Sequence, residues 1–514
     1  MRSPRLVLVL AVGALAVSAC SGSGKSSGSA RTPGRAGASV PASAGSDTRP
    51  ALATVLAPRV SQGAQAKLEL VGLNRLGAGN VVVQLRITNL GSGASIGLGA
   101  EIADETMGTP EWHWPSGIGL LDPAARKILM PYRTAGEGCL CSTDKDITAS
   151  SGWSIRPGLS QTVFAVLPAP SGGAKTTTVV TPMGPPMVDV PISDERPTAP
   201  PGQVIPDPGS TTVTPLSYPI ETSTEAFDKT EETQTDGKDV HVNLSSDVLF
   251  ALGKADLSPQ AEVILRQTAR QIDASPGSTV QVDGHADSSG TDEINDPLSQ
   301  QRADMVKTRL AALVTRSGVG FNAKGYGSHR PLYTNDSDEG RRRNRRVTVT
   351  FERQAPSAPP AAGTPVPSGR QGPQVQGRND KGTSFTAQVT GLRPIGNGLG
   401  VLTYKITNKG KDRDEVNLAW GEDWMKLKYI AASTVAVVDP AARLRYPAAR
   451  YIIDGGGGRN RMCVCQGLSG VRLSLDEFGP DETKELWAVV ALPATSPVSV
   501  DIGKFPRLSG VAVS

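Results

Sequence analysis

One short stretch of the chain places a carboxylate and a guanidinium at a spacing that suits binding of a charged ligand. Residues 284–290 end an apolar strand pattern and include Asp287, and Arg302 follows on the next expected helix. A carboxylate accepts hydrogen bonds from an ammonium group, and a guanidinium forks onto a carboxylate. This pair is suited to holding a zwitterionic ligand, so the sequence indicates a binding protein.

The same stretch gives no indication of catalysis. His285 lies beside Asp287, but no Ser or Cys nucleophile accompanies it in the motif, so we expect a turn residue rather than a catalytic base. Paired carboxylates in a hydrolase setting are not evident either. We therefore expect no enzyme activity, no catalytic residue, no metal and no cofactor.

The elements that must position this pair are predicted by the periodicity of residues 237–353. Strands are expected at residues 240–244, 280–284, 321–325 and 347–351. Ser258-Pro259 supplies an N-cap and a first-turn proline for one helix, and Ser299 is expected to be the N-cap of the second. Arg302 would then lie in a first helical turn, where the helix dipole favours an anion. The fold class is α+β, of the βαβα type with a mixed sheet.

This block resembles the C-terminal domain of the OmpA family, the OmpA-like peptidoglycan-binding domain. The matching residues are Phe250, Leu257, Ser258, Gly284-His285-Ala286-Asp287-Ser288-Ser289-Gly290, Asn295, Leu298-Ser299-Gln300-Gln301-Arg302-Ala303, Val306, Leu310, Gly325-Tyr326-Gly327, Pro331, Asn335, Gly340-Arg341 and Asn344-Arg345-Arg346-Val347. One departure is Ala286, where the family usually has threonine. So many spaced matches make the resemblance specific.

The resemblance implies binding of the diaminopimelate residue of peptidoglycan stem peptides. Asp287 would accept from the ammonium of that residue, and Arg302 would hold its carboxylate. By the same resemblance Asn295 and Arg345 complete the pocket, and it is lined by Ala286 and Leu298. The alternative is a structural ion pair between Asp287 and Arg302, which would stabilise the fold little. The neighbouring arginines of residues 341–346 are expected to be mostly solvated, with Arg345 as the exception.

The N-terminal residues predict export and lipidation. Two arginines precede an apolar run at residues 6–17, which is too short to span a bilayer. The following Val17-Ser18-Ala19-Cys20 resembles the bacterial lipobox, which implies cleavage before Cys20 and acyl chains such as palmitate on that residue. We expect residues 1–19 to be a lipoprotein signal peptide, against ordinary secretion or an uncleaved anchor. The mature chain would then be held on the extracytoplasmic side of the membrane.

Three segments without apolar periodicity divide the rest of the chain. Residues 20–62 are rich in Ser, Gly, Ala and Pro and are expected to be disordered, while residues 194–236 and 354–382 read as Pro/Thr-rich and Pro-rich linkers. The net charge of +4 on 514 residues is too weak to imply a nucleic-acid partner.

The two outer blocks, residues 63–193 and 383–514, are copies of each other. Asp122-Pro123-Ala124-Ala125-Arg126 recurs as Asp439-Pro440-Ala441-Ala442-Arg443. Alternating β-branched residues and turn signals about every ten residues predict an antiparallel, immunoglobulin-like β-sandwich in each. We call these blocks module 1 and module 2.

Each module keeps one Cys-x-Cys pair, Cys139 with Cys141 and Cys463 with Cys465. In an oxidising compartment a disulfide inside each pair is the simplest interpretation. A disulfide between modules, a soft-metal site of four thiolates and a redox role are the alternatives.

The sequence as a whole predicts a cell-envelope lipoprotein that binds peptidoglycan noncovalently and so tethers the membrane to the wall. The alternative is an adhesion or assembly protein whose outer modules bind an envelope protein, with the middle domain only localising it.

Overall fold

The computed structural model describes residues 47–57, 65–104, 115–136, 138–143, 154–354, 372–416, 434–455, 458–466 and 477–514. The expected signal peptide, Cys20 and much of the linkers at 20–62 and 354–382 lie outside these residues. Within the described ranges, no helix is both long and apolar enough to cross a membrane.

Module 1 is built from two antiparallel sheets that share one apolar core. The first sheet has the order β1 (Ala53–Leu56), β2 (Ala66–Arg75), β3 (Asn80–Asn89) and β8 (Ser160–Pro168). The second contains β10 (Met187–Pro191), β9 (Thr176–Val180), β5 (Gly119–Asp122) and β6 (Lys127–Thr134). A short pair, β4 (Ile96–Gly97) with β7 (Ser154–Ile155), and the helix α1 (Leu98–Ile102) complete the described module. Buried side chains from both sheets, such as Leu85 and Leu120, belong to one cluster.

Module 2 has the same strand order in its first sheet. That sheet contains β17 (Gln374–Arg378), β18 (Ser384–Gly396), β19 (Leu399–Asn408) and β26 (Thr483–Ala491). Its remaining strands are β20 (Asp414–Glu415), β21 (Val435–Asp439), β22 (Leu444–Pro447), β23 (Arg450–Gly455), β24 (Gly458–Cys463), β25 (Glu477–Phe478), β27 (Val498–Ile502) and β28 (Leu508–Val511). The immunoglobulin-like assignment of the two modules stays a prediction.

One buried asparagine explains why the same Ile-Thr-Asn sequence ends a strand in both modules. Asn89 and Asn408 are fully buried, and each donates two hydrogen bonds from its amide to main-chain carbonyls. Each side-chain oxygen accepts from a backbone N–H two residues on, that of Gly91 or Gly410. Because all these groups are paired, the asparagine fixes the turn without the cost of an unsatisfied buried amide.

The cysteines of each module are bonded within their own pair. The structure has disulfides between Cys139 and Cys141 and between Cys463 and Cys465. The second cysteine of each pair makes an isolated β-bridge within its own module, to Ala165 of β8 or to Ala488 of β26. This is the intramodular pairing that the sequence favours.

The long strand β11 (Val213–Ala226) corrects the linker expected at residues 194–236. It pairs antiparallel with β6 of module 1, with β12 (Glu231–Thr235), and with β22 and β23 of module 2. Pro215 falls at a register shift, where the strand can lack an N–H donor. The linker was predicted from residue composition. That prediction was wrong because strands pair through backbone N–H and C=O groups, which every residue except proline carries in full. For the same reason β1 and β17 form inside segments expected to be unstructured.

A buried apolar cluster joins β11 to both modules. It contains Leu121 and Met130 from module 1, Tyr218 from β11, and Tyr451 and Trp487 from module 2. The rings of Tyr218 and Tyr451 have centroids 5.3 Å apart. The modules therefore share a core.

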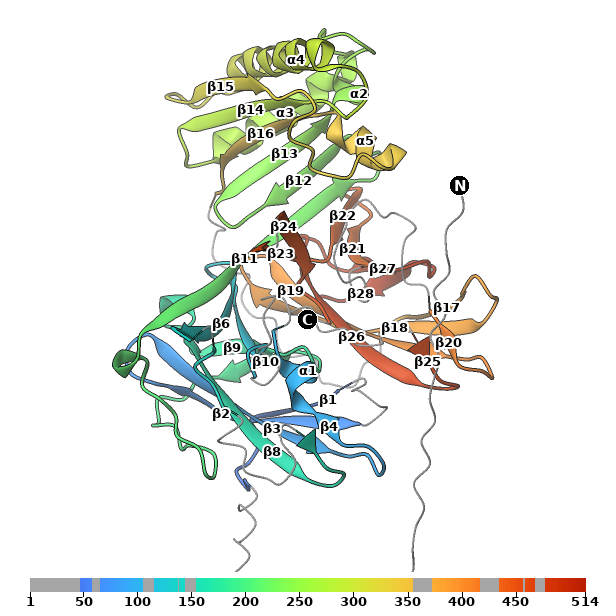
Figure 1. The fold of residues 1–514 in the computed structure, drawn as a ribbon. Coiled ribbons are helices and arrows are strands. Elements are labelled where there is room, and N and C mark those ends of the chain that lie inside the picture. Colours follow the sequence, from blue (N-terminus) through green and yellow to red (C-terminus); the bar gives the residue numbers. More distant parts are fainter. Residues whose placement is uncertain are drawn as a thin grey trace, which may run out of the picture. The chain divides into compact units, whose positions relative to one another are not determined.

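The middle domain contributes five strands to a larger mixed sheet, which continues through β11, and two long helices lie against one face of these strands (Figure 1). The strand order is β12, β13 (Asp239–Ser245), β16 (Arg346–Glu352), β14 (Thr279–His285) and β15 (Gly320–Gly325). Only β14 and β15 pair in parallel among these strands, as the sequence-predicted mixed sheet requires. The helices are α2 (Ser246–Leu249), α3 (Pro259–Ala274), α4 (Asp292–Leu313) and α5 (Asp338–Asn344). Buried side chains of α3 and α4 pack on the sheet in one core.

The start of the second long helix differs from the expectation. The N-cap of α4 is Thr291 rather than Ser299, and Asp292 and Glu293 occupy the first turn. Pro297 lies inside the helix, where a proline is normally a signal for a boundary. Arg302 is consequently not in a first turn, and the expected contribution of the helix dipole at Arg302 is wrong.

Candidate ligand-binding site

Glycines at the ends of two strands allow α4 to lie directly against the sheet. A Cβ atom on Gly284 of β14 would overlap the carbonyl oxygen of Ser299. A Cβ atom on Gly325 of β15 would overlap the backbone of Gln300. The hydroxyl of Ser299 accepts a hydrogen bond from the backbone N–H of Gly327 at 2.9 Å. The helix is thus fixed beside the loop that follows β14, which carries Asp287.

Asp287 is a buried carboxylate held by its own loop and by an arginine. Its Oδ1 accepts hydrogen bonds from the backbone N–H of Ser289 at 2.8 Å and from the Ser289 hydroxyl. Its Oδ2 accepts from Nη1 of Arg345 at 2.6 Å. Burial alone would raise the pKa of Asp287, but the hydrogen bonds from Ser289 and Arg345 outweigh it and hold the pKa below its ordinary value. The group is therefore an anion at neutral pH.

Arg345 connects Asp287 to a second carboxylate. Its Nε and Nη2 donate to the two oxygens of Asp247, at 2.9 Å and 2.7 Å. These hydrogen bonds, with the one to Asp287, raise the pKa of Arg345 further above its ordinary value. Arg345 is therefore held between two anions. The ion-pair partner of Asp287 in the structure is Arg345, and not Arg302 as in the structural alternative considered from the sequence.

Arg302 lies beside this cluster, with its side chain half-buried. Its Nε donates to the carbonyl of Lys254 at 3.0 Å, and its guanidinium lies 5.1 Å from the centroid of the Phe250 ring. Burial lowers the pKa of Arg302, and the nearby charge of Arg345 lowers it further, while Asp247 acts in the opposite direction. Within the described part of the chain, its Nη1 and Nη2 groups make no hydrogen bond. They are available to an anion.

The other expected pocket residues have different roles. Asn295 is buried and donates to the carbonyl of Ser289 at 2.9 Å. It therefore holds the loop that carries Asp287, which we call the ligand loop. The backbone N–H of Ala286 donates to Gly327 at 2.7 Å, and both Ala286 and Leu298 are half-buried. The loop is thus fixed through backbone groups, which do not depend on the threonine hydroxyl that Ala286 lacks.

Two residues of the site were missed by the sequence reasoning. Asp247 is the second carboxylate on Arg345, and its only sequence signal is its place just before Phe250. Asn335 accepts from the backbone N–H of Ser288 at 3.3 Å and from the side chain of Asn344 at 2.9 Å. The sequence places Asn335 in the family motif but indicates no role for it.

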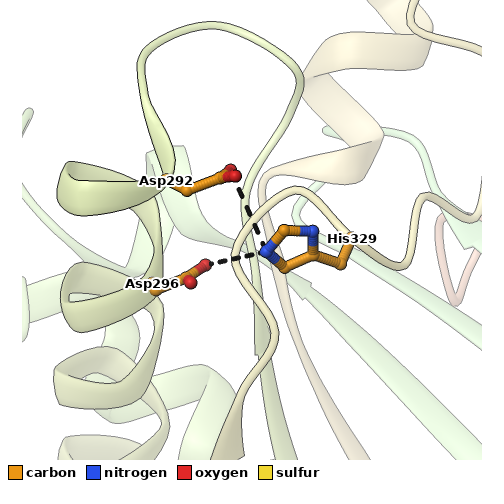
Figure 2. A group of neighbouring side chains, drawn as sticks. All are labelled: Asp292, Asp296 and His329. Carbon is orange, nitrogen blue, oxygen red and sulfur yellow. Dashed lines mark ion pairs between the residues drawn. The ribbon is translucent and has the colours of Figure 1, made fainter.

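A second charged group lies at the start of α4. Nε2 of His329 is 3.9 Å from Oδ1 of Asp292 and 3.4 Å from Oδ1 of Asp296, and Figure 2 shows the imidazole facing both carboxylates. Among the described residues, these three offer ligand atoms that lie within 4.8 Å of one another. All three side chains are exposed, and a cation there would lie at the positive end of α4. We interpret the trio as charge balance at the helix end.

The profile of the OmpA family matches residues 249–345. This part of the chain is an OmpA-family domain. The match includes both long helices, Asp287, Arg302 and Arg345, and it excludes the flanking modules.

Curated relatives share this level of similarity over a limited length. The probable lipoprotein YiaD of Escherichia coli K12 is 35% identical over 118 residues, which is 22% of this chain and 52% of that protein. The peptidoglycan-binding protein ArfA of Mycobacterium tuberculosis is 36% identical over 102 residues, or 20% of this chain and 31% of that protein. Outer membrane porin F of Pseudomonas aeruginosa is 35% identical over 114 residues, or 22% and 33%. The chain therefore spans between a third and about half of the length of these relatives.

Solved structures give similar partial matches. The cell wall anchor of the T6SS from Pseudomonas aeruginosa is 32% identical, with 24% of this chain and 90% of that chain covered and a TM-score of 0.23. The peptidoglycan-associated lipoprotein from Burkholderia pseudomallei is 26% identical, with 20% and 86% covered and a TM-score of 0.17.

Proposed function

We propose that this protein binds peptidoglycan noncovalently through its OmpA-family domain, by recognition of the diaminopimelate residue of stem peptides. The observation that carries the proposal is the cluster of Asp247, Asp287, Arg302 and Arg345, which we call the charged cluster. Among the relatives, ArfA is named as a peptidoglycan-binding protein. The rest of the support is chemical.

Diaminopimelate presents an ammonium and a carboxylate on the last carbon of its side chain. Arg302 has unused Nη donors that can fork onto the carboxylate. Asp287 is anionic, and a carboxylate has about four acceptor positions, so its Oδ2 can accept from an ammonium besides Arg345. The cluster therefore offers one partner for each charge of the ligand.

The direct test is co-sedimentation of the purified full chain with purified diaminopimelate-type peptidoglycan. Arg302→Ala removes the carboxylate partner, and Asp287→Asn removes the ammonium partner. We expect each variant to weaken binding by at least about ten-fold, since loss of a charge-assisted pair typically costs 1.4 kcal/mol or more.

The matched control is Asp380→Asn, in the turn between β17 and β18. Asp380 pairs with Lys504 at 3.2 Å and is exposed, so the substitution changes the net charge as Asp287→Asn does but lies outside the OmpA-family domain. Sedimentation of the Arg302 and Asp287 variants at the level of this control would refute the proposed site.

The lipid anchor extends the proposal to a tether between membrane and wall. We propose that Cys20 carries the acyl chains and that the protein resides on the extracytoplasmic side of the membrane. Two or more acyl chains can hold a protein firmly at a membrane, whereas a single chain gives only marginal binding. Mass spectrometry of the N-terminal peptide of the mature protein would show the lipid, and an unmodified Cys20 would exclude it.

We further propose that the protein acts without catalysing a reaction. In the described residues, the buried His285 faces Tyr326 rather than a nucleophile. Incubation with wall fragments should release no soluble muropeptide, and release would show an enzyme.

A further inference from the structure

Asp247 is the member of the charged cluster that no motif match assigned. It lies in the four-residue helix α2, which ends just before Phe250, and its side chain is 43% exposed. Its two oxygens accept from Nε and Nη2 of Arg345, so the contact is bidentate. A bidentate pair fixes the plane of a guanidinium as well as its position.

The fixed plane decides which donors of Arg345 remain for a ligand. A guanidinium has five N–H donors. Two of them point to Asp247 and one points to Asp287, which leaves one N–H on Nη1 and one on Nη2. Without Asp247 the guanidinium could turn and place its fork on Asp287, where it would compete with a ligand ammonium for the same carboxylate.

Asp247 also sets the charge of the site. The charged cluster holds two carboxylates and two guanidiniums, so its formal charge is zero. Asp247 lies close enough to Arg302 to oppose the repulsion that Arg345 exerts on that side chain. With Asp247 neutral, the cluster would carry a net positive charge and would attract any anion. With it charged, a ligand that brings one positive and one negative group is favoured over a ligand that brings a negative group alone.

We propose that Asp247 is a positioning and specificity-determining residue, which orients Arg345 and makes the site selective for a zwitterionic ligand over a purely anionic one. The proposal rests on the proposed recognition of diaminopimelate. A purely structural role is disfavoured because ion pairs with this degree of exposure stabilise a fold little.

The test compares two ligands on the full chain by isothermal titration calorimetry. One is a stem tripeptide that ends in diaminopimelate, and the other is the same tripeptide with 2-aminopimelate, which keeps the terminal carboxylate and lacks the ammonium. We expect the wild type to prefer the first ligand. Asp247→Asn should reduce the ratio of the two affinities by about ten-fold, mostly by weaker binding of the zwitterion.

Two further variants separate specificity from folding. Asp247→Glu keeps the charge and can still reach Arg345, so it should restore most of the ratio. Asp380→Asn makes the same charge change outside the OmpA-family domain and should leave the ratio unchanged.

The outcomes distinguish this inference from the function on which it rests. If the wild type binds neither tripeptide, the proposed function and this inference both fail. If the wild type prefers the zwitterion and Asp247→Asn keeps the same ratio, the proposed function stands and the role of Asp247 is wrong. A wild type that binds both ligands equally also overturns the role of Asp247, because there is then no selectivity for it to set.

Discussion

His285, two residues before Asp287, is held as a neutral imidazole. It is buried at the end of β14 and stacks on Tyr326 with ring centroids 5.5 Å apart. Burial, with the guanidiniums of Arg346 and Arg330 nearby, lowers the pKa of His285 to about 2. Its place in the ligand motif is therefore structural.

This shift predicts a loss of stability in mild acid. An unfolded histidine has a pKa of about 6.5, so below that pH the unfolded chain binds a proton that the folded chain excludes. Stability is present above pH 6.5 and falls as the pH falls, by up to about 1.4 kcal/mol per pH unit. His285→Phe keeps a ring and removes the titration. Calorimetric scans from pH 7 to pH 5 should show the wild type losing stability relative to the variant, and parallel curves would contradict the assignment.

Most residues of the site could be predicted from the sequence, because the motif places them at fixed spacings. Asp287, Arg302 and Arg345 do lie in one charged cluster. Asp247 could not be predicted, since a lone aspartate before an apolar run has no signal of its own. The arginines of residues 341–346 were expected to be mostly solvated, and this was wrong for Arg343 and Arg346, which are both buried. Arg343 pairs with Glu225 and Glu232. Those partners lie more than a hundred residues away along the chain, where no spacing rule reaches them.

At the scale of elements, α4 connects the ligand loop to the rest of the domain. The hydroxyl of Ser299 donates to the carbonyl of Asp296 at 2.9 Å and accepts from Gly327. Gly327 in turn accepts from the backbone N–H of Ala286 on the ligand loop. One side chain inside the helix therefore supports the loop that presents Asp287.

Ser299→Ala should loosen this connection without changing the charged cluster. It leaves the buried N–H of Gly327 unpaired, which typically costs about 1–3 kcal/mol. Hydrogen exchange should show faster opening of the segments around Ala286 and Gly327. Thr308→Ala, which removes an exposed hydroxyl bond in the same helix, is the control and should leave that exchange unchanged. Equal exchange in the two variants would refute the connection.

The helix boundary shows why local rules were insufficient at this scale. Ser299 has the residue type of an N-cap, and Pro297 just before it is normally a signal to end a helix. The tertiary contacts favoured an earlier start, because Gly284 and Gly325 allow the backbone at Ser299 to pack on two strands. Four strands of the middle domain, β13, β14, β15 and β16, were predicted correctly because their apolar alternation follows directly from the buried face of the sheet. The strand β12 was missed, because its polar sequence lies in the segment expected to be a linker.

At the scale of the whole molecule, β11 turns a presumed spacer into part of a core. Tyr218 of this strand is buried with Tyr451 of module 2 and Met130 of module 1. Sequence reasoning separated module 1 from the rest of the chain because residues 194–236, which follow it, are rich in proline, threonine and glutamate. Its pairing partners lie on other strands far along the chain, and the sequence alone does not specify them.

This shared core predicts that the two modules unfold together. Tyr451→Ala removes a ring that is 2% exposed, and deletion of a buried aromatic side chain typically costs about 3–5 kcal/mol. Calorimetry should show the transitions of both modules moving to lower temperature, while Leu244→Ala in the middle domain's own core should not move them. A shift confined to module 2 would show that the modules are energetically separate.

The central claim is that the charged cluster recognises both charges at the end of diaminopimelate. Its most direct test is calorimetric titration of the full chain with two stem tripeptides, one ending in diaminopimelate and one ending in lysine, which has the ammonium but no carboxylate for Arg302. The account predicts binding of the diaminopimelate peptide and at least about ten-fold weaker binding of the lysine peptide, the equivalent of one lost charge-assisted contact. Equal affinity for the two peptides, or binding of neither, would contradict it.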